Sequence, residues 1–378
     1  MKSNYKQLGQ FIRQVDVRNT DGREDNLLGV SVQKKFIPSI ANTVGTDFRK
    51  YKIVKRGQFT YIPDTSRRGD KIAIALLLDY EEGIVSNVYT VFEVIDENQL
   101  LSEYLMLWFM RPEFDRYARF KSHGSVREVM DWDEMCKVEL PVPEIEKQRQ
   151  IVKAYNTIND RIALKRKIND NLSEQTATLF QNLFSIHKND PYKMEKLGSY
   201  VSFSQGTQVP VEDQYMLDEI GDTERFVRFI RIVDYTTNQQ ETPRYIKEKS
   251  NQCSCSPDEV TMVRYGNVGL VGRRIEGVIA NNIFKIIPKA PLTNNFLYYF
   301  LSQKSIYDFI VSSCGGSAMP SIKHRTIGDL EFVLPTLTLL SQFEEFANKT
   351  EKAIRTNNAE IILLRDQLSV IIAKLLTC

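Results

Sequence analysis

Residues 140–184 read LPVPEIEKQRQIVKAYNTINDRIALKRKINDNLSEQTATLFQNLF, and a degraded copy of this stretch begins at Leu334-Pro335 and closes the chain. Aligning Leu140-Pro141 with Leu334-Pro335 places Gln148 on Gln342. After a slip of two residues, the first copy continues to match the second, with Leu172, Gln175, Leu179, Leu183 and Phe184 on Leu364, Gln367, Ile371, Leu375 and Leu376. The repeat decides the fold, because the structure formed by the first copy is expected again in the second.

Each copy has the residue spacing of one long helix. Apolar or seam positions recur in alternating steps of three and four, which is typical of a helix that packs on a partner helix. They are Ile151, Tyr155, Ile158, Ile162, Ile168, Leu172, Gln175, Leu179 and Leu183 in the first copy, and Phe346, Ile354, Ile361, Leu364, Leu368, Ile371 and Leu375 in the second. One such segment could equally be an amphipathic helix on a globular core. Two matching copies predict that the helices pack on each other.

The repeat extends beyond the helices. Lys6-Gln7-Leu8-Gly9 opens the first half, and the similar Glu195-Lys196-Leu197-Gly198 opens the second. A globular unit followed by a helix is therefore used twice, over about 8–187 and 197–378. Strand-like segments are expected at 52–62 (a pair around Arg56-Gly57), 71–78, 83–94, 226–233, 258–263 and 277–287, and helices at 99–109, 295–300 and 305–311. Each globular unit is thus expected to mix α and β structure.

Composition places the chain among globular proteins of two or three domains. It has 378 residues, 42% of them hydrophobic, and lacks the run of about eighteen apolar residues that a membrane span needs. Its N-terminus MKSNYKQLGQ lacks the apolar core of a signal peptide, so we expect a cytoplasmic protein. Five cysteines without a C-x-x-C pair and three widely separated histidines argue against a disulfide framework or a metal site.

The net charge of +2 hides a segregated distribution. Residues 1–80 hold 15 Lys and Arg against 8 Asp and Glu, and residues 81–139 hold 6 against 13, so that +7 and −7 cancel. A weaker basic surplus, 9 against 5, spans residues 225–275. Such segregation fits a protein with one face for phosphates and another for a different partner. The alternative is ordinary surface charge that interleaves once the chain folds.

The familiar enzyme motifs are missing or incomplete. The sequence contains no G-x-x-x-x-G-K-[ST] phosphate loop, and the G-x-x-G-x-x-G spacing of Gly266, Gly269 and Gly272 is not the dinucleotide pattern. Asn189-Asp190-Pro191-Tyr192 resembles the tetrapeptide with which amino-methyltransferases hold a flipped base, but its second position is not proline and no glycine-rich cofactor loop accompanies it. We expect a helix-terminating linker there and no catalytic constellation in the chain.

Loop residues able to contact DNA are what remains. Arg, Lys, Asn and Gln read base edges in the major groove, and Ser contacts phosphates. The first unit offers Lys34, Lys35, Ser66, Arg67, Arg68, Lys71, Ser125 and Arg127. The second offers Gln208, Arg264, Tyr265, Asn267, Arg273, Arg274, Asn282, Ser317, Lys323, His324 and Arg325. The recurrence of Arg67-Arg68 as Arg273-Arg274 in glycine-bearing loops favours binding over ordinary solvated pairs.

Local marks follow the same order in both halves. The first half has Gly124-Ser125, Trp132-Asp133, Leu140-Pro141-Val142-Pro143 and Gln148; the second has Gly315-Gly316-Ser317, Ile322, Leu334-Pro335 and Gln342. With these marks, the whole chain resembles the specificity subunits of type I restriction-modification systems. The second copy departs from the pattern in having Leu337 where the first has Pro143, which leaves the start of its helix less defined.

The resemblance implies an α+β fold with an internal repeat, in which two similar mixed α/β target recognition domains are separated by two long helices that form an antiparallel coiled coil. Its implied boundaries are 1–140 for target recognition domain 1, 141–187 for the central spacer helix, 188–334 for target recognition domain 2 and 335–378 for the C-terminal spacer helix. Each domain would read one half of a split, asymmetric double-stranded DNA site. The chain itself would not be an enzyme.

The resemblance also implies partners: two methyltransferase subunits, and restriction subunits where the system includes them. S-adenosylmethionine, ATP and Mg would be bound by those partners, with no cofactor in this chain. About 40 helical residues at roughly 1.5 Å each make a rod of ~60 Å, long enough to hold two readers more than one ~34 Å DNA turn apart. We expect the helix seams and the acidic 81–139 face, with Glu81, Glu82 and Glu93, to help dock the methyltransferase.

Two alternatives remain open from the sequence. One is an enzyme, a nuclease or methyltransferase that uses an unrecognised motif. The other is a coiled-coil scaffold whose globular ends bind proteins and which has no DNA specificity.

Overall fold

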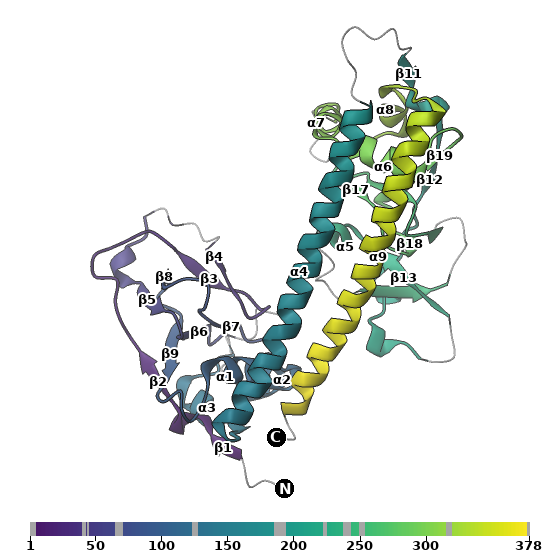
Figure 1. Ribbon diagram of the computed structural model, residues 1–378. Coiled ribbons are helices and arrows are strands. Elements are labelled where there is room, and N and C mark those ends of the chain that lie inside the picture. Colours follow the sequence, from purple (N-terminus) through teal and green to yellow (C-terminus); the bar gives the residue numbers. More distant parts are fainter. Residues whose placement is uncertain are drawn as a thin grey trace. The chain divides into compact units, whose positions relative to one another are not determined.

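A computed structural model describes residues 5–39, 43, 45–64, 71–122, 128–184, 194–221, 225–236, 243–248, 254–314 and 320–375 (Figure 1). The chain forms two compact units. Unit 1 is Met1–Leu164 with Glu360–Cys378, and unit 2 is Lys165–Ala359. Two long helices, α4 (Ile145–Phe184) and α9 (Leu337–Lys374), each contribute to both units. Within the described ranges, none of the helices combines the length and apolarity needed to cross a membrane.

Unit 1 is built on a four-stranded antiparallel sheet in the order β2-β9-β6-β7. Its register places Ile12 opposite Val94 and Phe59 opposite Phe92. Smaller pairs are β1-β10, β3-β4 and β5-β8. The strands are β1 (Tyr5–Gln7), β2 (Ile12–Val15), β3 (Leu28–Val30), β4 (Phe36–Pro38), β5 (Lys52–Lys55), β6 (Phe59–Tyr61), β7 (Ile74–Leu76), β8 (Glu82–Val85), β9 (Thr90–Val94) and β10 (Glu139–Pro141). The helices are α1 (Ser102–Phe109), α2 (Pro112–Lys121) and α3 (Trp132–Cys136), with 3-10 turns η1 (Leu8–Gln10) and η2 (Phe48–Lys50).

The core of unit 1 lies between the sheet and α1. Phe59 and Phe92 stack on neighbouring strands with ring centroids 4.8 Å apart, and Phe109 of α1 meets both rings edge-on. Val152 of α4 and Leu375 of α9 belong to the same buried cluster. Burial of this cluster stabilises the unit, and because Val152 and Leu375 belong to it, both long helices are integral to the unit.

Unit 2 repeats the plan, with a four-stranded antiparallel sheet in the order β12-β19-β16-β17 and a small β11-β20 pair. A second sheet, β14-β13-β18-β15, contains the parallel pair β13-β18. The strands are β11 (Met194–Lys196), β12 (Val201–Gln205), β13 (Phe226–Ile230), β14 (Arg244–Lys247), β15 (Ser254–Cys255), β16 (Val260–Val263), β17 (Val271–Gly272), β18 (Gly277–Ile279), β19 (Ile283–Pro288) and β20 (Glu331–Val333). The helices are α5 (Ile232–Thr236), α6 (Asn294–Leu301), α7 (Lys304–Ser312) and α8 (His324–Gly328), with 3-10 turns η3 (Leu197–Ser199), η4 (Val211–Asp213) and η5 (Leu217–Glu219).

The predicted internal repeat is confirmed by the matching strand orders. The Leu-Gly motif that opens each half has a packing reason. A Cβ on Gly9 would lie 2.8 Å from the Cβ of Cys136, and a Cβ on Gly198 would lie 3.1 Å from the Cα of Gly328. A side chain at either glycine would push the 3-10 turn away from the helix preceding the last strand of its unit. Outside the shared sheet the units differ: where unit 2 has a second four-stranded sheet, the described residues of unit 1 form the two-stranded pairs β3-β4 and β5-β8.

The two long helices pack together as predicted (Figure 1). In unit 1, Ile162 of α4 lies in one buried cluster with Ile361, Leu364 and Leu368 of α9. In unit 2, Asn169 of α4 hydrogen-bonds to Asn357 and Asn358 of α9. As the residue number rises along one helix it falls along the other, so the pairing is antiparallel.

Part of the predicted seam is wrong. Ile168 and Phe346 are 39% and 38% exposed, and Gln175 is exposed as well. The buried positions of α4 in this region are instead Asn169, Thr176 and Phe180. Two of these buried residues, Asn169 and Thr176, are polar. A prediction based on apolar residues alone therefore chose the positions next to them.

Two strand expectations also need correction. Residues 52–62 contain β5 and β6, but they do not pair with each other: β5 pairs with β8, and β6 pairs with β7 and β9. The reason is that Arg56 N–H donates to Glu81 O and Gly57 N–H to Leu77 O, which carries the chain from one sheet to another. Residues 83–94 and 277–287 each form two strands.

The sequence alignment of Gln148 with Gln342 is wrong by two residues, because α4 begins at Ile145 and α9 at Leu337, so that Leu340 takes the place of Gln148. The side chain of Gln148 is fully buried at the start of α4, whereas Gln342 is exposed. Gln148 donates to the carbonyls of Gln99 and Pro143 and accepts from Leu101 N–H, at 2.8–2.9 Å. It therefore fastens the first turn of α4 to the segment before α1.

Candidate nucleic-acid interface

A cluster of amides and one guanidinium lies in unit 2 where β12 ends beside the start of β19. Gln205 closes β12, and its Nε2 donates to the carbonyl of Asn281 at 2.6 Å. Arg264 Nη1 lies 3.5 Å from Gln205 Oε1, and Asn281 Nδ2 lies 3.5 Å from Gln208 Oε1. We name Gln205, Gln208, Arg264, Asn281 and Asn282 the amide–arginine cluster.

The backbone fixes this cluster in place. Arg264 follows the fully buried strand β16, its N–H donates to Asn282 O, and its carbonyl accepts from Ile322 N–H. Gly206 permits the turn after β12, because a Cβ there would lie 2.1 Å from the carbonyl oxygen of Ala280. Arg264 is therefore a half-buried side chain on a rigid strand end, which is the kind of support that a base-reading residue needs.

His324 forms an apolar wall beside the cluster. Its ring stacks on Phe203 at 4.5 Å with an interplanar angle of 6°, and it also contacts Phe284. Burial, followed by the nearby charge of Arg264, lowers the pKa of His324. The imidazole is therefore neutral at physiological pH and acts as a packing surface rather than as a cation for phosphate.

The other predicted DNA contacts of unit 2, two of which belong to this cluster, differ in exposure. Gln208, Asn267, Lys323 and Arg325 are exposed, and Tyr265 and Asn282 are partly buried. Arg325 pairs with Asp329 at 3.4 Å, a contact open to solvent. Tyr265 bridges to Ser321, which brings the loop after β16 next to the segment before α8. DNA contact by these residues stays a prediction.

Arg273 and Arg274 are engaged inside unit 2. Arg274 donates from Nε and Nη2 to both oxygens of Glu351 on α9, at 2.9 and 2.7 Å. Arg273 is 8% exposed, and its Nη2 donates to Asn295 Oδ1 at 2.7 Å. These guanidiniums hold the sheet against α9, so we leave them out of the proposed DNA-contacting surface.

Lys34 has a comparable internal position in unit 1. Its Nζ lies 2.8 Å from Asp115 Oδ1, also donates to the carbonyl of Phe109, and lies over the Phe114 ring. Burial lowers the pKa of Lys34, and the Asp115 carboxylate opposes that shift. Lys34 therefore ties the β3-β4 turn to α2.

Much of the predicted surface of unit 1 lies outside the described residues. Lys35 and Lys71 are described and exposed. Ser66, Arg67, Arg68, Ser125 and Arg127 fall in ranges 65–70 and 123–127, and Ser317 of unit 2 falls in 315–319; all of these lie outside the described residues. The linker at Asn189–Tyr192 also lies outside them.

The segregated charges of the first half pair with each other across the fold. Arg13 pairs with Glu93, Arg23 with Glu82 and Arg56 with Glu81, at 2.6, 2.5 and 2.8 Å. For these residues the alternative stated from the sequence holds: acidic and basic side chains interleave on the surface once the chain folds. Their carboxylates are neutralised within unit 1, which weakens the case for a separate acidic docking face.

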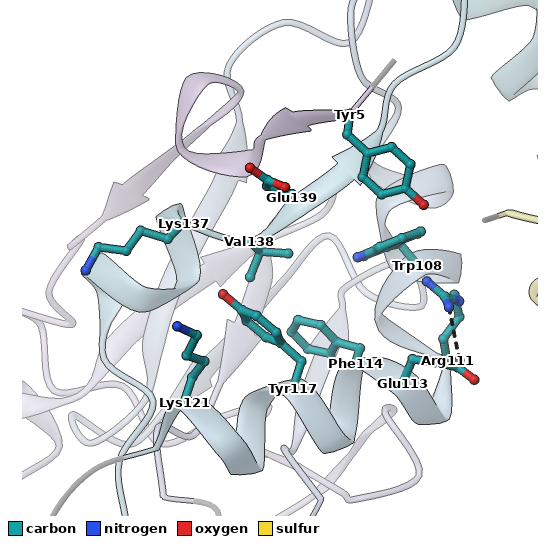
Figure 2. A pocket seen from close by; sticks show the side chains of 10 residues that line it. All are labelled: Tyr5, Trp108, Arg111, Glu113, Phe114, Tyr117, Lys121, Lys137, Val138 and Glu139. Carbon is teal, nitrogen blue, oxygen red and sulfur yellow. Dashed lines mark ion pairs between the residues drawn. The ribbon is translucent and has the colours of Figure 1, made fainter. Parts of the chain in front are cut away.

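A cavity of about 660 Å³ opens in unit 1, between β1, α1, α2 and the start of β10 (Figure 2). Arg111 is 2% exposed, lies 4.2 Å from the centre of the Trp108 ring and pairs with Glu113 at 3.1 Å. The remaining lining residues are Tyr5, Phe114, Tyr117, Lys121, Lys137, Val138 and Glu139. Three cations, Arg111, Lys121 and Lys137, and two carboxylates, Glu113 and Glu139, line the cavity, so it does not present a uniformly positive surface for phosphates.

Sequence reasoning missed Gln205 and Asn281. Both lie at strand ends, Gln205 before a glycine and Asn281 between β18 and β19. Two sequence features could have identified them: Asn281 is an amide next to the predicted Asn282, and Gln205 is an amide at the end of a strand. Within the described ranges, no three His, Cys, Asp or Glu side chains are grouped so as to hold a metal ion.

The chain is an internally repeated protein. It has two similar α/β units, each built on an antiparallel sheet and each packed on both long helices. The sequence model of the family described as type I restriction modification DNA specificity domain matches residues 11–174 and 218–357. The chain belongs to this family and is a specificity subunit with a DNA-recognition role.

Individual relatives agree with that assignment. The chain is 20% identical over 313 residues to the type I restriction enzyme MjaIX specificity subunit of Methanocaldococcus jannaschii, covering 75% of this chain and 70% of the relative. It is 24% identical over 184 residues to the type I restriction enzyme HindI specificity subunit of Haemophilus influenzae, covering 47% of this chain and 39% of the relative. Among solved structures, the type I restriction-modification S subunit from M. genitalium superposes with a TM-score of 0.55 at 12% identity, over 98% of this chain and 95% of that one.

Proposed function

We propose that each unit reads one half of a bipartite, asymmetric DNA site, and that the amide–arginine cluster is the base-reading part of unit 2. The single observation that supports this most is the cluster itself. It holds Arg264 beside Gln205 and Asn282 at a strand end, with Gln208 next to Asn281, on a scaffold that unit 1 repeats with different loops. Arg pairs with guanine and Asn or Gln with adenine through two hydrogen bonds each, so such a group can discriminate bases.

Exposed lysines in both units would supply the sequence-independent part of binding. Lys323 precedes α8, and Lys35 and Lys71 are exposed in unit 1. Phosphate contacts of this kind position a protein on the duplex and make its affinity fall with salt. The different loops of the two units would make the two half-sites differ.

We further propose that α4 and α9 act as a spacer. With 40 and 38 residues they are long enough for a rod of ~60 Å at roughly 1.5 Å per residue. A rod of that length would allow half-sites more than one ~34 Å turn of DNA apart.

The partners proposed are two methyltransferase subunits, with restriction subunits where the system includes them. S-adenosylmethionine, ATP and Mg would belong to those subunits, and the complex would act in the cytoplasm. Because the seam residues are used between α4 and α9, the docking surface would be the outer faces of these helices. Large apolar side chains are exposed there, at Leu164 (58%), Ile362 (52%) and Leu363 (63%).

Sequencing of methylated DNA tests this function. Cells that express the chain with its methyltransferase partner should show one bipartite methylated motif that is lost when the chain is removed. Methylation without sequence preference in the presence of the chain would contradict the proposal. Activity of the purified chain alone would favour an enzyme instead.

A further inference from the structure

The paired helices contain a polar layer within unit 2. Asn169 of α4 is 9% exposed and uses both ends of its amide: its Nδ2 donates to Asn358 Oδ1 at 2.9 Å, and its Oδ1 accepts from Asn357 Nδ2 at 2.8 Å. Lys165 Nζ donates to Asn357 Oδ1 at 3.0 Å. We name Asn169, Asn357 and Asn358 the amide layer.

Most buried positions next to the amide layer are apolar, and the exception is Thr176, seven residues after Asn169. On α9 the buried stripe runs through Ile354, which is 1% exposed, and continues at Ile361, which is 6% exposed. Asn357 lies three residues after the first and four before the second, so it occupies a seam position. On α4, Ile162 is the preceding buried position, seven residues before Asn169.

An apolar seam alone would not define one alignment of the helices. Aliphatic side chains such as Ile and Leu pack against one another in several registers with similar contacts. A slip of α9 by one turn would place Ile354 or Ile361 opposite Asn169. The buried amide would then lose its hydrogen bonds, which is the basis on which a polar seam residue selects one register in coiled coils.

We propose that the amide layer fixes the register of α4 against α9, and thereby the number of base pairs between the two half-sites. This inference rests on the proposed function, since it assigns the spacing of the DNA site to named residues. Asn169, Asn357 and Asn358 are positioning residues that touch no DNA. Their role is to exclude misaligned helix pairs.

The test replaces the layer with an apolar one. Asn169→Leu and Asn357→Leu are combined in the full chain and expressed with its methyltransferase partner, and methylated DNA is sequenced. Asn171→Leu is the matched control, because Asn171 is exposed on the same helix. A one-turn slip of ~5.4 Å corresponds to roughly 1–2 base pairs of ~3.4 Å each. The double variant should therefore methylate the same two half-sites at additional spacings shifted by that amount.

The melting temperature of the purified chain provides a second measurement. It should stay equal or rise in the double variant, because buried amides are replaced by well-packed apolar groups. The control variant should keep the original single spacing.

Two results would overturn the inference. One is full methylation at only the original spacing in the double variant. The other is a chain that no longer folds, which would show that the amides hold the fold rather than the register. Failure of the proposed function is a separate result, because the unaltered chain would then give no bipartite motif.

Discussion

Arg274 and Glu351 join the sheet of unit 2 to α9 through two hydrogen bonds, from Nε and Nη2 of the guanidinium to both carboxylate oxygens. The Glu351 side chain is 3% exposed and the Arg274 side chain 17%. Tyr299 OH adds a third hydrogen bond to Glu351, at 3.1 Å. The base-reading surface proposed for unit 2 is thus fastened to a spacer helix by a buried ion pair.

Glu351→Gln should destabilise unit 2 strongly, because it leaves the guanidinium of Arg274 buried without a counter-charge. Breaking a buried pair from one side costs about 3–5 kcal/mol in the free energy of unfolding. Urea denaturation of the full chain measures this. Glu345→Gln is the control: Glu345 pairs with Lys349 on the exposed face of the same helix, and its loss should leave the midpoint unchanged. Equal midpoints for the two variants would show that the buried pair contributes nothing.

The stability contributed by Glu351 should depend on pH in acid. Burial alone would raise the pKa of Glu351, but its hydrogen bonds with Arg274 and the charges of both arginines hold it below the usual 4.5. A carboxyl group with a lowered folded-state pKa stabilises fully above its unfolded value and loses that contribution as pH falls through the folded value. The difference in unfolding free energy between the unaltered chain and Glu351→Gln should therefore shrink below pH 4.5. A difference independent of pH would contradict the assignment.

Gln148→Leu should destabilise unit 1, because it leaves the N–H of Leu101 and the carbonyls of Gln99 and Pro143 without their partner. Buried groups left unsatisfied cost about 1–3 kcal/mol each. Chemical denaturation followed by tryptophan fluorescence suits this test, since Trp108 and Trp132 both lie in unit 1. Gln342→Leu, at the exposed position that the sequence alignment pairs with Gln148, should change little. Similar losses for both variants would mean that the hydrogen bonds of Gln148 are not the cause.

Arg264→Lys should relax base preference at one position of one half-site. Lysine cannot reproduce the paired donors of a guanidinium, and a good bidentate contact discriminates against wrong bases by about 1–3 kcal/mol. Sequencing of methylated DNA from cells with the variant measures this, with the other half-site as an internal reference. Arg225→Lys provides the control, since Arg225 is 90% exposed at its side chain in the same unit and lies outside the amide–arginine cluster. Uniform weakening at all positions would identify Arg264 as a phosphate contact instead.

The sequence predicted the fold well where periodicity reports burial. The paired long helices and the repeated α/β units were foreseen because Ile162, Ile361 and Leu364 follow a helical seam and because the Leu-Gly marks recur. It failed at Ile168, since the buried position next to it is a polar residue whose partners lie on another helix. Hydropathy gives no sign that an asparagine will be satisfied by residues about 190 positions later in the chain.

The site was predicted only in part, because residue type does not show which charges find partners within the fold. Arg264 and Asn282 are brought together at one strand end, and Gln208 lies next to Asn281 in the same cluster. Arg273 and Arg274, equally basic in sequence, turn inward to Asn295 and Glu351. The pairing depends on tertiary contacts between a sheet and a helix, which no local pattern encodes.

The central claim is that each unit reads its own half-site from a shared scaffold. The most direct measurement replaces Leu197–Val333 with a copy of Leu8–Pro141, the segment that ends at the matching residue of β10, so that the chain carries the first globular unit twice, and sequences the DNA methylated by the resulting complex. The account predicts a motif in which the first half-site occurs twice and the second half-site is absent. Retention of the original asymmetric motif would contradict it.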